Sequence, residues 1–120
     1  MIVVHHNARC GKSRAVLALL AERGEPCVVV DYLEAGWSRA RLLALFAVAG
    51  IAPREALRAT ESKRLAPALL DVDEDAEADR ERVVAAMVDH PILVERPLVC
   101  APGGVAICRP PERVLDLIGR

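Results

Sequence analysis

The sequence predicts an α/β protein: a mixed β-sheet flanked by helices, with an all-helical segment between its two β-containing halves. Residues 1–31 read as a strand, a helix and a second strand, which is a β-α-β order. Residues 38–90 carry helical patterns only, and residues 98–120 return to two strand-like runs and a helix. A βαβ unit requires a parallel strand pair and a hairpin an antiparallel one, so the sheet should be mixed.

Apolar periodicity and capping residues define the individual elements. Strands are predicted at residues 1–5, 27–31, 98–100 and 105–108, the last two joined by the turn Pro102-Gly103-Gly104. The first helix is predicted at residues 14–23 and ends at Gly24, and the second runs from Ser38 to Gly50, with Leu42, Leu45, Phe46 and Ala49 on one face. A short helix at residues 54–59 follows Pro53, and another around Val83, Val84, Met87 and Val88 ends before His90-Pro91. The last helix follows Pro110-Pro111 and has Val114, Leu115 and Ile118 on one face. This is the order of a thioredoxin-like sheet with a helical insertion at about residues 38–90, and residues 1–120 are expected to form one domain.

Composition excludes several classes of function. The chain is 53% hydrophobic with a formal charge of -1, so no global field would recruit nucleic acid or an anionic membrane. Its three aromatic side chains are too few to stack bases. The N-terminus lacks the pattern of a signal peptide, and the longest apolar run, residues 42–52, is well short of the roughly 20 residues that span a bilayer. We therefore expect a cytoplasmic protein that contacts neither nucleic acid nor membrane.

Residues 71–81 hold seven acids and one base, a net charge of −6 that leaves +5 for the rest of the chain. The alternation Asp71-x-Asp73-x-Asp75 is similar to a calcium-binding loop. However, Ala76 stands where that loop needs glycine and Arg82 where it needs glutamate. A solvated helix start, with acids at the positive end of the helix dipole, is the better interpretation.

The segment of residues 6–14 follows a strand and leads into a helix, which places Cys10 at or beside a helix N-terminus. Exposed backbone N–H groups and the helix dipole favour an anion there, so the thiol should ionise more readily than a free cysteine. Arg9, Lys12 and Arg14 add positive charge close by. The pattern predicts a nucleophilic cysteine that also attracts an anionic substrate.

Spacing excludes four competing motifs in this segment. A phosphate-binding P-loop would need glycine where the chain has His6, and a Cys-x-x-Cys redox motif would need cysteine in place of Ser13. A phosphatase loop would need arginine in place of Val16. A zinc site from His5, His6 and Cys10 lacks any recognised ligand spacing, so no metal is expected.

The roles of the neighbouring residues stay open at this point. His6 either helps to polarise the thiol or hydrogen-bonds within the turn, and Ser13 either caps the helix or hydrogen-bonds the thiolate. Cys27 and Cys100 lie in or beside strand-like runs, where a buried free cysteine behaves as a small hydrophobe. That interpretation applies less to Cys108, which adjoins an arginine.

Two separated runs resemble the signatures of the glutaredoxin-coupled arsenate reductases. The first is His6-Asn7-x-x-Cys10-Gly11-x-Ser13-Arg14, and the second is His90-Pro91-Ile92-Leu93-Val94-Glu95-Arg96-Pro97-Leu98-Val99, followed by Cys108-Arg109-Pro110. The match in order and spacing covers nearly the whole chain and implies the thioredoxin-like fold with a helical insertion. Ala8 and Lys12 depart from the family, which often has proline and a small hydroxyl residue there.

The resemblance implies that Cys10 is the nucleophile, assisted by His6 and Ser13. It implies that arsenate is bound by Arg58, Arg96 and Arg109, whose planar donor forks suit a tetrahedral oxyanion, with Asn7, Gly11 and Arg14 completing the anion site. Electrons would come from glutathione as co-substrate and from glutaredoxin, to a monomer with no bound cofactor. Because Ser13 replaces a second cysteine, the second thiol must come from outside the chain. Thioredoxin-like folds also place a cis-proline opposite the active-site cysteine, which predicts a cis Arg96-Pro97 bond.

Two other classes of function remain open on the sequence. One is a glutathione-dependent thiol reductase of the same fold with a different substrate. The other is a non-enzymatic regulator related to thiol-stress proteins that bind RNA polymerase. Those regulators commonly use a Cys-x-x-Cys switch, which Ser13 rules against, and three arginines favour an oxyanion substrate over both alternatives.

Overall fold

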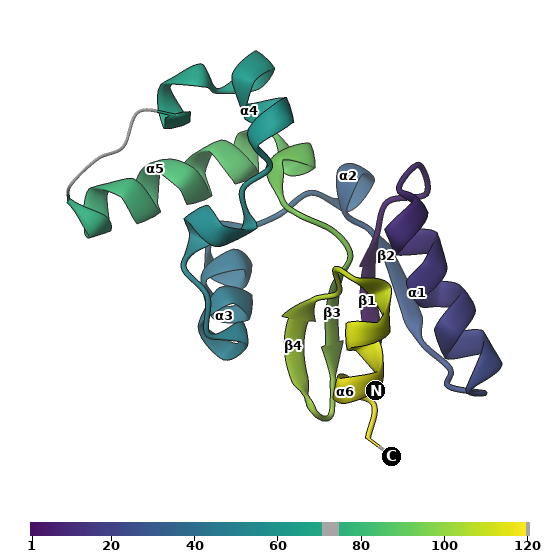
Figure 1. The fold of residues 1–120 in the computed structure, drawn as a ribbon. Helices are drawn as coiled ribbons and strands as arrows, with labels where there is room; N and C mark the ends of the chain where they lie inside the picture. Colours follow the sequence, from purple (N-terminus) through teal and green to yellow (C-terminus); the bar gives the residue numbers. More distant parts are fainter. Residues whose placement is uncertain (71–74, 120) are drawn as a thin grey trace. The chain divides into compact units, whose positions relative to one another are not determined.

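The computed structural model describes residues 1–70 and 75–119, and the chain divides into two compact units (Figure 1). We call Met1–Ala35 with Arg96–Arg120 the sheet unit, and Gly36–Glu95 the helical unit. The helical unit extends the predicted insertion by a few residues at each end. One domain over residues 1–120 stays a prediction.

The sheet unit contains the predicted mixed sheet, in the strand order β2-β1-β3-β4. β1 runs parallel to β2 and antiparallel to β3, and β3 and β4 form the predicted hairpin. The register places His5 opposite Leu98 and His6 beside Asp31. The strands are β1 (Val3–His6), β2 (Val28–Asp31), β3 (Leu98–Ala101) and β4 (Gly104–Ile107).

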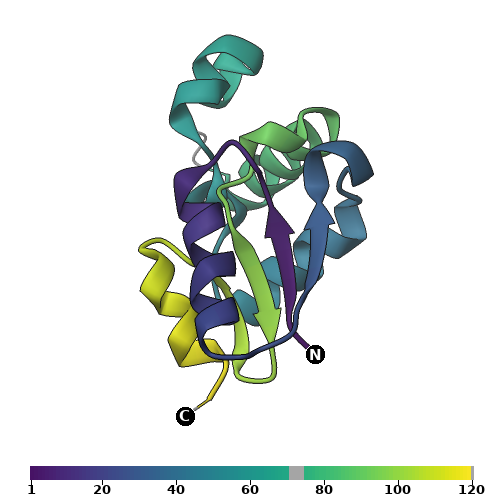
Figure 2. The same cartoon turned by 90° about the vertical axis from the view of Figure 1, so that its right-hand side faces the viewer.

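Helices α1 (Gly11–Glu22) and α6 (Val114–Leu117) pack on the sheet through one apolar core (Figure 2). The buried members of that core are Ile2, Val4, Val16, Leu20, Val99, Cys108, Val114 and Leu117. α1 begins three residues before the predicted residue 14, because Cys10 already occupies the N-cap. In α6, Leu117 is buried, whereas the predicted Leu115 and Ile118 are only partly buried. The single turn α2 (Tyr32–Ala35) was not predicted.

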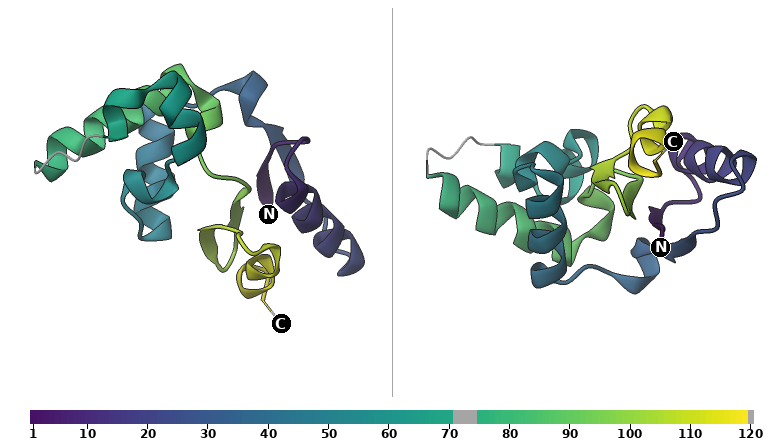
Figure 3. Two further views of the ribbon diagram at one scale, coloured as in Figure 1. Left: turned by 45° about the horizontal axis from the view of Figure 1, so that its top comes forward. Right: turned by 90° about the horizontal axis from the view of Figure 1, so that it is seen from below.

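The helical unit is built on α3 (Arg39–Ala49) and α5 (Ala76–Asp89), which pack against each other (Figure 3). Ser38 caps α3 as predicted, accepting a hydrogen bond from the Arg41 N–H at 3.1 Å, and Gly50 ends it at a φ of 72°. Between them lie η1 (Pro53–Ala56), α4 (Ala59–Leu65) and η2 (Pro67–Leu70), and η3 (Pro91–Leu93) follows α5.

The helix predicted at residues 54–59 is confirmed only at its start, where Pro53 opens the 3-10 turn η1. Leu57 pairs with Val94 as an antiparallel bridge, which ends the 3-10 turn η1 at Ala56, and α4 then begins at Ala59. The bridge joins residues far apart in the sequence, so the local pattern could not reveal it.

The acidic segment starts a helix, as predicted, in the part that the structure describes. Asp75 is the N-cap of α5, and its carboxylate accepts hydrogen bonds from the N–H groups of Glu77 and Ala78 at 3.0 and 3.3 Å. The preceding acids, with Asp71 and Asp73 of the calcium-like alternation, lie outside the described residues. Within residues 1–70 and 75–119, no helix combines the length and apolar character needed to cross a membrane.

Gly103 in the β3–β4 turn allows a close approach to the end of α6. Its N–H donates to the Leu117 carbonyl at 2.9 Å, and a Cβ here would lie 2.5 Å from that same oxygen. We expect Gly103→Ala to lower the free energy of unfolding by about 1–3 kcal/mol, because backbone must move to admit the methyl group. Urea unfolding measures the change.

Gly11→Ala is the matched control for this prediction. A Cβ there would contact only the flexible end of Arg14 at 3.7 Å, so stability should change little. Unfolding of Gly103→Ala at the wild-type urea concentration would show that the turn tolerates the methyl group.

Candidate active site

The loop between β1 and α1 presents Cys10 at the N-cap of α1, in the extended backbone conformation that precedes a helix. The Cys10 N–H donates to the Asn7 carbonyl at 3.0 Å. The Asn7 side chain is buried, accepting from the Arg9 N–H at 3.0 Å and donating to the Tyr32 hydroxyl at 3.4 Å. Asn7 therefore shapes the loop that holds the partly exposed Cys10.

Ser13 and His6 form a second set of contacts under this loop. The fully buried Ser13 hydroxyl accepts from the Asn7 N–H at 3.1 Å and lies 2.8 Å from Nδ1 of His6. Burial lowers the pKa of His6; Asp31 raises it and Arg14 lowers it, and the net shift is downward. The hydrogen bond that one interpretation gave to His6 is present, with Ser13 as its partner, and Cys10 rather than Ser13 occupies the N-cap of α1. A role of His6 or Ser13 in polarising the Cys10 thiol stays a prediction.

The exposed Arg14 side chain also contacts this loop. Its Nη1 donates to the Ala8 carbonyl at 2.8 Å, and Gly11, the first residue of α1, lies beneath the Arg14 side chain. Anion-binding roles for Asn7, Gly11 and Arg14 stay predictions.

Two arginines meet at Cys10 from a distant part of the chain. Arg109 Nη1 lies 3.9 Å from the Cys10 sulfur and donates to the Arg96 carbonyl at 3.1 Å. The predicted cis Arg96-Pro97 bond is confirmed, and Arg109-Pro110 is also cis. The Arg109 guanidinium thus reaches the thiol at the N-terminus of α1, and the Arg96 guanidinium favours the thiolate form of the same residue.

The pKa of the Cys10 thiol is lowered. Burial acts to raise it, but the Ser13 N–H, the Arg96 guanidinium and then the Lys12 N–H favour the thiolate and outweigh burial. The Cys10 side chain accepts no regular capping hydrogen bond from the first N–H groups of α1. These N–H groups therefore act on the thiolate from a longer distance. The thiolate is the nucleophilic form, so the site supplies a nucleophile beside arginine side chains, whose binding of an anion stays a prediction.

Arg58, the third predicted oxyanion ligand, lies in the helical unit, whereas Cys10, Arg96 and Arg109 lie in the sheet unit. Its guanidinium bonds two carboxylates, those of Glu61 and Glu95. Its binding of an oxyanion stays a prediction.

The other three thiols differ from Cys10. Cys108 is fully buried in the core, and burial raises its pKa to about 12. Cys27 and Cys100 are only partly buried, which corrects their interpretation as core residues, although Cys27 packs against the core. All four cysteines are free thiols.

We expect Cys10 to be alkylated by iodoacetamide at a lower pH than a free cysteine, whose pKa is about 8.5. The measurement is the pH–rate profile of carboxamidomethylation at the Cys10 peptide, followed by mass spectrometry. Cys108 should stay unmodified in the folded protein. A Cys10 profile centred on the free-cysteine value would contradict the prediction.

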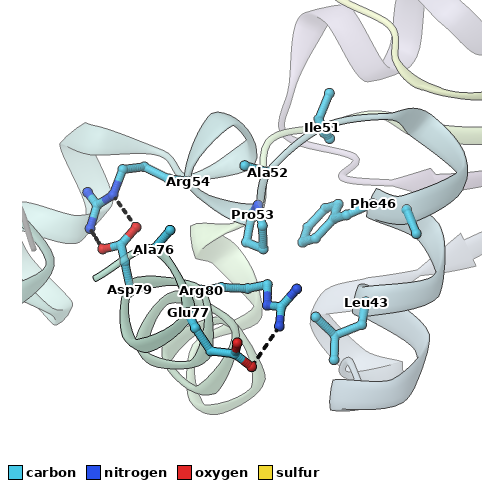
Figure 4. A pocket seen from close by; sticks show the side chains of 11 residues that line it. Leu43, Phe46, Ile51, Ala52, Pro53, Arg54, Ala76, Glu77, Asp79 and Arg80 are labelled. Carbon is cyan, nitrogen blue, oxygen red and sulfur yellow. Dashed lines mark hydrogen bonds and ion pairs between the residues drawn. The ribbon is translucent and has the colours of Figure 1, made fainter. Parts of the chain in front are cut away.

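A groove of about 590 Å³ lies in the helical unit, between α3 and the start of α5 (Figure 4). Leu43, Phe46 and Pro53 provide apolar walls, and the ion pair between Arg54 and Asp79 lies at its edge. None of the predicted site residues is among the described residues that line it. In the described residues, no three His, Cys, Asp or Glu side chains are arranged to hold a metal ion.

Sequence reasoning missed two contributors to the site. Tyr32 is buried and supports Asn7 from β2's end, and His5, considered only as a zinc ligand, bonds the Leu98 carbonyl through Nδ1 at 2.9 Å. The change from apolar to polar residues within β1 marks His5 as unusual, but only the folded structure shows what His5 and Tyr32 contact.

Residues 5–117 match the ArsC family. The chain is 48% identical over 118 residues to the arsenate reductase ArsI2 of Synechocystis sp., covering 98% of this chain and 81% of that protein. It is 41% identical over 121 residues to the uncharacterized protein YfgD of Escherichia coli, covering 98% and 97%. The solved structure of an arsenate reductase from Vibrio cholerae matches with a TM-score of 0.85 and 36% identity, over 98% and 97% of the two chains.

Proposed function

Because this chain belongs to the ArsC family, we propose that it reduces arsenate to arsenite, with Cys10 as the nucleophile. The observation that carries the proposal is the approach of Arg109 to the Cys10 thiol, whose pKa is lowered with the help of the Arg96 guanidinium. Cationic forks beside a thiolate suit a tetrahedral oxyanion that must be held within bonding distance of sulfur. Arsenate reductases among the relatives support the same substrate.

The proposed reaction is nucleophilic catalysis at arsenic. The Cys10 thiolate attacks arsenic(V), forming a sulfur–arsenic bond while one arsenate oxygen leaves, protonated, as water. Glutathione displaces a second oxygen in the same way. A glutaredoxin thiolate then attacks the glutathione sulfur, and the electron pair of the broken sulfur–arsenic bond reduces arsenic to arsenic(III). Water releases arsenite and restores Cys10, leaving a glutathione–glutaredoxin disulfide.

The positions of the other cysteines support an external second thiol. Cys100 pairs with Val3, at the start of β1, whereas Cys10 follows His6 at the end of that strand. Val3 and His6 are three residues apart in β1, which is roughly 10 Å along a strand. Cys27 precedes Val28, the β2 residue that pairs with Val3, so it also lies near the start of β1. With Cys108 buried, a glutathione-type thiol from solution is the natural partner for a monomeric enzyme.

The test is arsenite formation from arsenate by the purified chain, with glutathione and glutaredoxin supplied together or singly. We expect arsenite only when both thiols are present. Arsenite formation at an equal rate without glutaredoxin would contradict the proposed electron donor. No arsenite under any condition, together with reduction of a glutathione mixed disulfide, would identify the chain as a thiol reductase with another substrate.

A further inference from the structure

Two cationic side chains flank Cys10 in the sheet unit. Arg9 precedes Cys10, and Lys12 is the second residue of α1; both residues are exposed, whereas Cys10 is partly buried. Within residues 1–70 and 75–119, neither the Arg9 nor the Lys12 side chain makes a hydrogen bond or an ion pair. Arg14 differs, because its guanidinium donates to the Ala8 carbonyl. The cationic ends of Arg9 and Lys12 are therefore available to a ligand from solution.

The backbone fixes both residues close to the thiol. The Arg9 N–H donates to the Asn7 side-chain oxygen at 3.0 Å, and the Cys10 N–H donates to the Asn7 carbonyl at 3.0 Å. On the other side, the Arg14 N–H donates to the Cys10 carbonyl at 3.1 Å, which closes the first turn of α1 around Lys12. Adjacent Cα atoms are about 3.8 Å apart, so side chains rooted one and two residues from Cys10 start within about 8 Å of its Cα.

The charge of this turn is unfavourable for α1 itself. The first turn of the helix is Gly11-Lys12-Ser13-Arg14, with cations where the positive end of the helix dipole favours acids. Helix α5 shows the favourable arrangement, with Glu77 and Asp79 in its first turn. A lysine at this end of α1, with no ion-pair partner among the described residues, indicates an anionic ligand from outside the chain.

We propose that Arg9 and Lys12 determine which thiol reacts at Cys10, favouring a small thiol that carries carboxylates over a neutral or cationic one. This inference rests on the proposed function, which requires a second thiol from outside the chain. In the proposed reaction Arg96 and Arg109 hold the oxyanion. The cations on either side of Cys10 then remain for the carboxylates of the incoming thiol. Because these charges are exposed to water, the selectivity should depend on ionic strength.

The experiment measures how fast thiols of different charge attack Cys10. One equivalent of 2,2′-dithiodipyridine converts the Cys10 thiol to a mixed disulfide with 2-thiopyridine, a neutral group, and mass spectrometry verifies the labelled peptide. An added thiolate then attacks the Cys10 sulfur and forms a new disulfide with it. The bond from Cys10 to the pyridine sulfur breaks with its electron pair, and the leaving group takes up a proton as 2-thiopyridone, which is followed by absorbance.

The thiols are glutathione, 2-mercaptoethanol and cysteamine, whose attacking forms carry two, one and no net negative charge. The ionisation of Cys10 does not affect these rates, because its sulfur is already bonded. The variants are Lys12→Gln, Arg9→Gln and the double variant. The matched control is Arg23→Gln, which removes an exposed cation at the opposite end of α1, about 16 Å along the helix from Lys12.

We expect each single variant to lower the rate with glutathione about two- to four-fold at an ionic strength of about 0.1 M. The rate with 2-mercaptoethanol should fall less, and the rate with cysteamine least. The double variant should lower the glutathione rate further, and about 1 M salt should reduce all these differences. Arg23→Gln should leave every rate near the wild-type value, because its charge is screened over that distance.

An equal fold-change for all three thiols in Lys12→Gln would give Lys12 a structural role in the loop and overturn the proposal. A wild-type glutathione rate in either single variant would overturn it as well. If Lys12→Gln does not fold, the charge-retaining Lys12→Arg, expected to keep the order of rates of the wild type, and Arg9→Gln decide the question by the same measurement.

The measurement needs no arsenate, so its result is separate from that of the proposed function. A wild-type chain that never reduces arsenate would remove the proposed function and leave the thiol selectivity of Cys10 intact. Arsenate reduction without charge selectivity among the three thiols would retain the proposed function and overturn the role of Arg9 and Lys12.

Discussion

Cys10→Ser is expected to lower the rate of arsenate reduction by about three orders of magnitude or more, because loss of a covalent nucleophile leaves only binding and electrostatic catalysis. A serine hydroxyl has a far higher pKa than a thiol, and the N–H groups and arginine that favour the thiolate cannot ionise it at neutral pH. Arsenite production by the variant, with glutathione and glutaredoxin in excess, measures the loss.

Cys27→Ser is the matched control for the nucleophile. It removes another partly buried thiol of the sheet unit and should retain most of the activity. Substantial arsenate reduction by Cys10→Ser, or an equal loss in Cys27→Ser, would contradict the assignment of Cys10.

Arg96→Ala and Arg109→Ala are each expected to lower kcat/KM for arsenate by roughly 10²–10³-fold, the typical cost of removing one donor from a developing anion. Arg96→Ala should also raise the Cys10 pKa, because that guanidinium favours the thiolate. Arg109→Ala removes both the donor 3.9 Å from the sulfur and the hydrogen bond to the Arg96 carbonyl. Steady-state kinetics over a range of arsenate concentrations, with circular dichroism to confirm folding, gives the comparison.

Arg113→Ala serves as the control for charge alone. Arg113 lies in the sheet unit and donates to the Ile107 carbonyl, so its loss removes one positive charge without touching the thiol. Its kcat/KM should stay within a few-fold of wild type. Near-wild-type kinetics in both Arg96→Ala and Arg109→Ala would remove them from the oxyanion site.

Local signals predicted the elements that depend on local contacts. Ser38 and Gly50 bound α3, and the glycine turn produced the β3–β4 hairpin, because each feature is decided within a few residues. The helix expected at residues 54–59 forms only as the 3-10 turn Pro53–Ala56, because the Leu57–Val94 bridge connects two segments that periodicity treats separately.

In the candidate site, too, local patterns predicted the local features and missed the long-range contacts. The position of Cys10 at a helix start followed from the strand–turn–helix pattern alone, whereas its pairing with Arg109 spans 99 residues and came only from family resemblance. The contacts of Arg58 with Glu95 span 37 residues and involve common charged residues, so no pattern marked them.

The distribution of thiols along the sheet also determines how the site responds to oxidants. A thiolate oxidised to sulfenic acid is protected when a nearby thiol condenses with it to a disulfide. Cys27 and Cys100 lie at the other end of the strands from Cys10, and Cys108 is buried in the core, so this chain offers Cys10 no such partner. Without a small thiol in solution, peroxide should carry Cys10 past the sulfenic acid to the irreversible sulfinic acid, and inactivation by storage in air should be permanent.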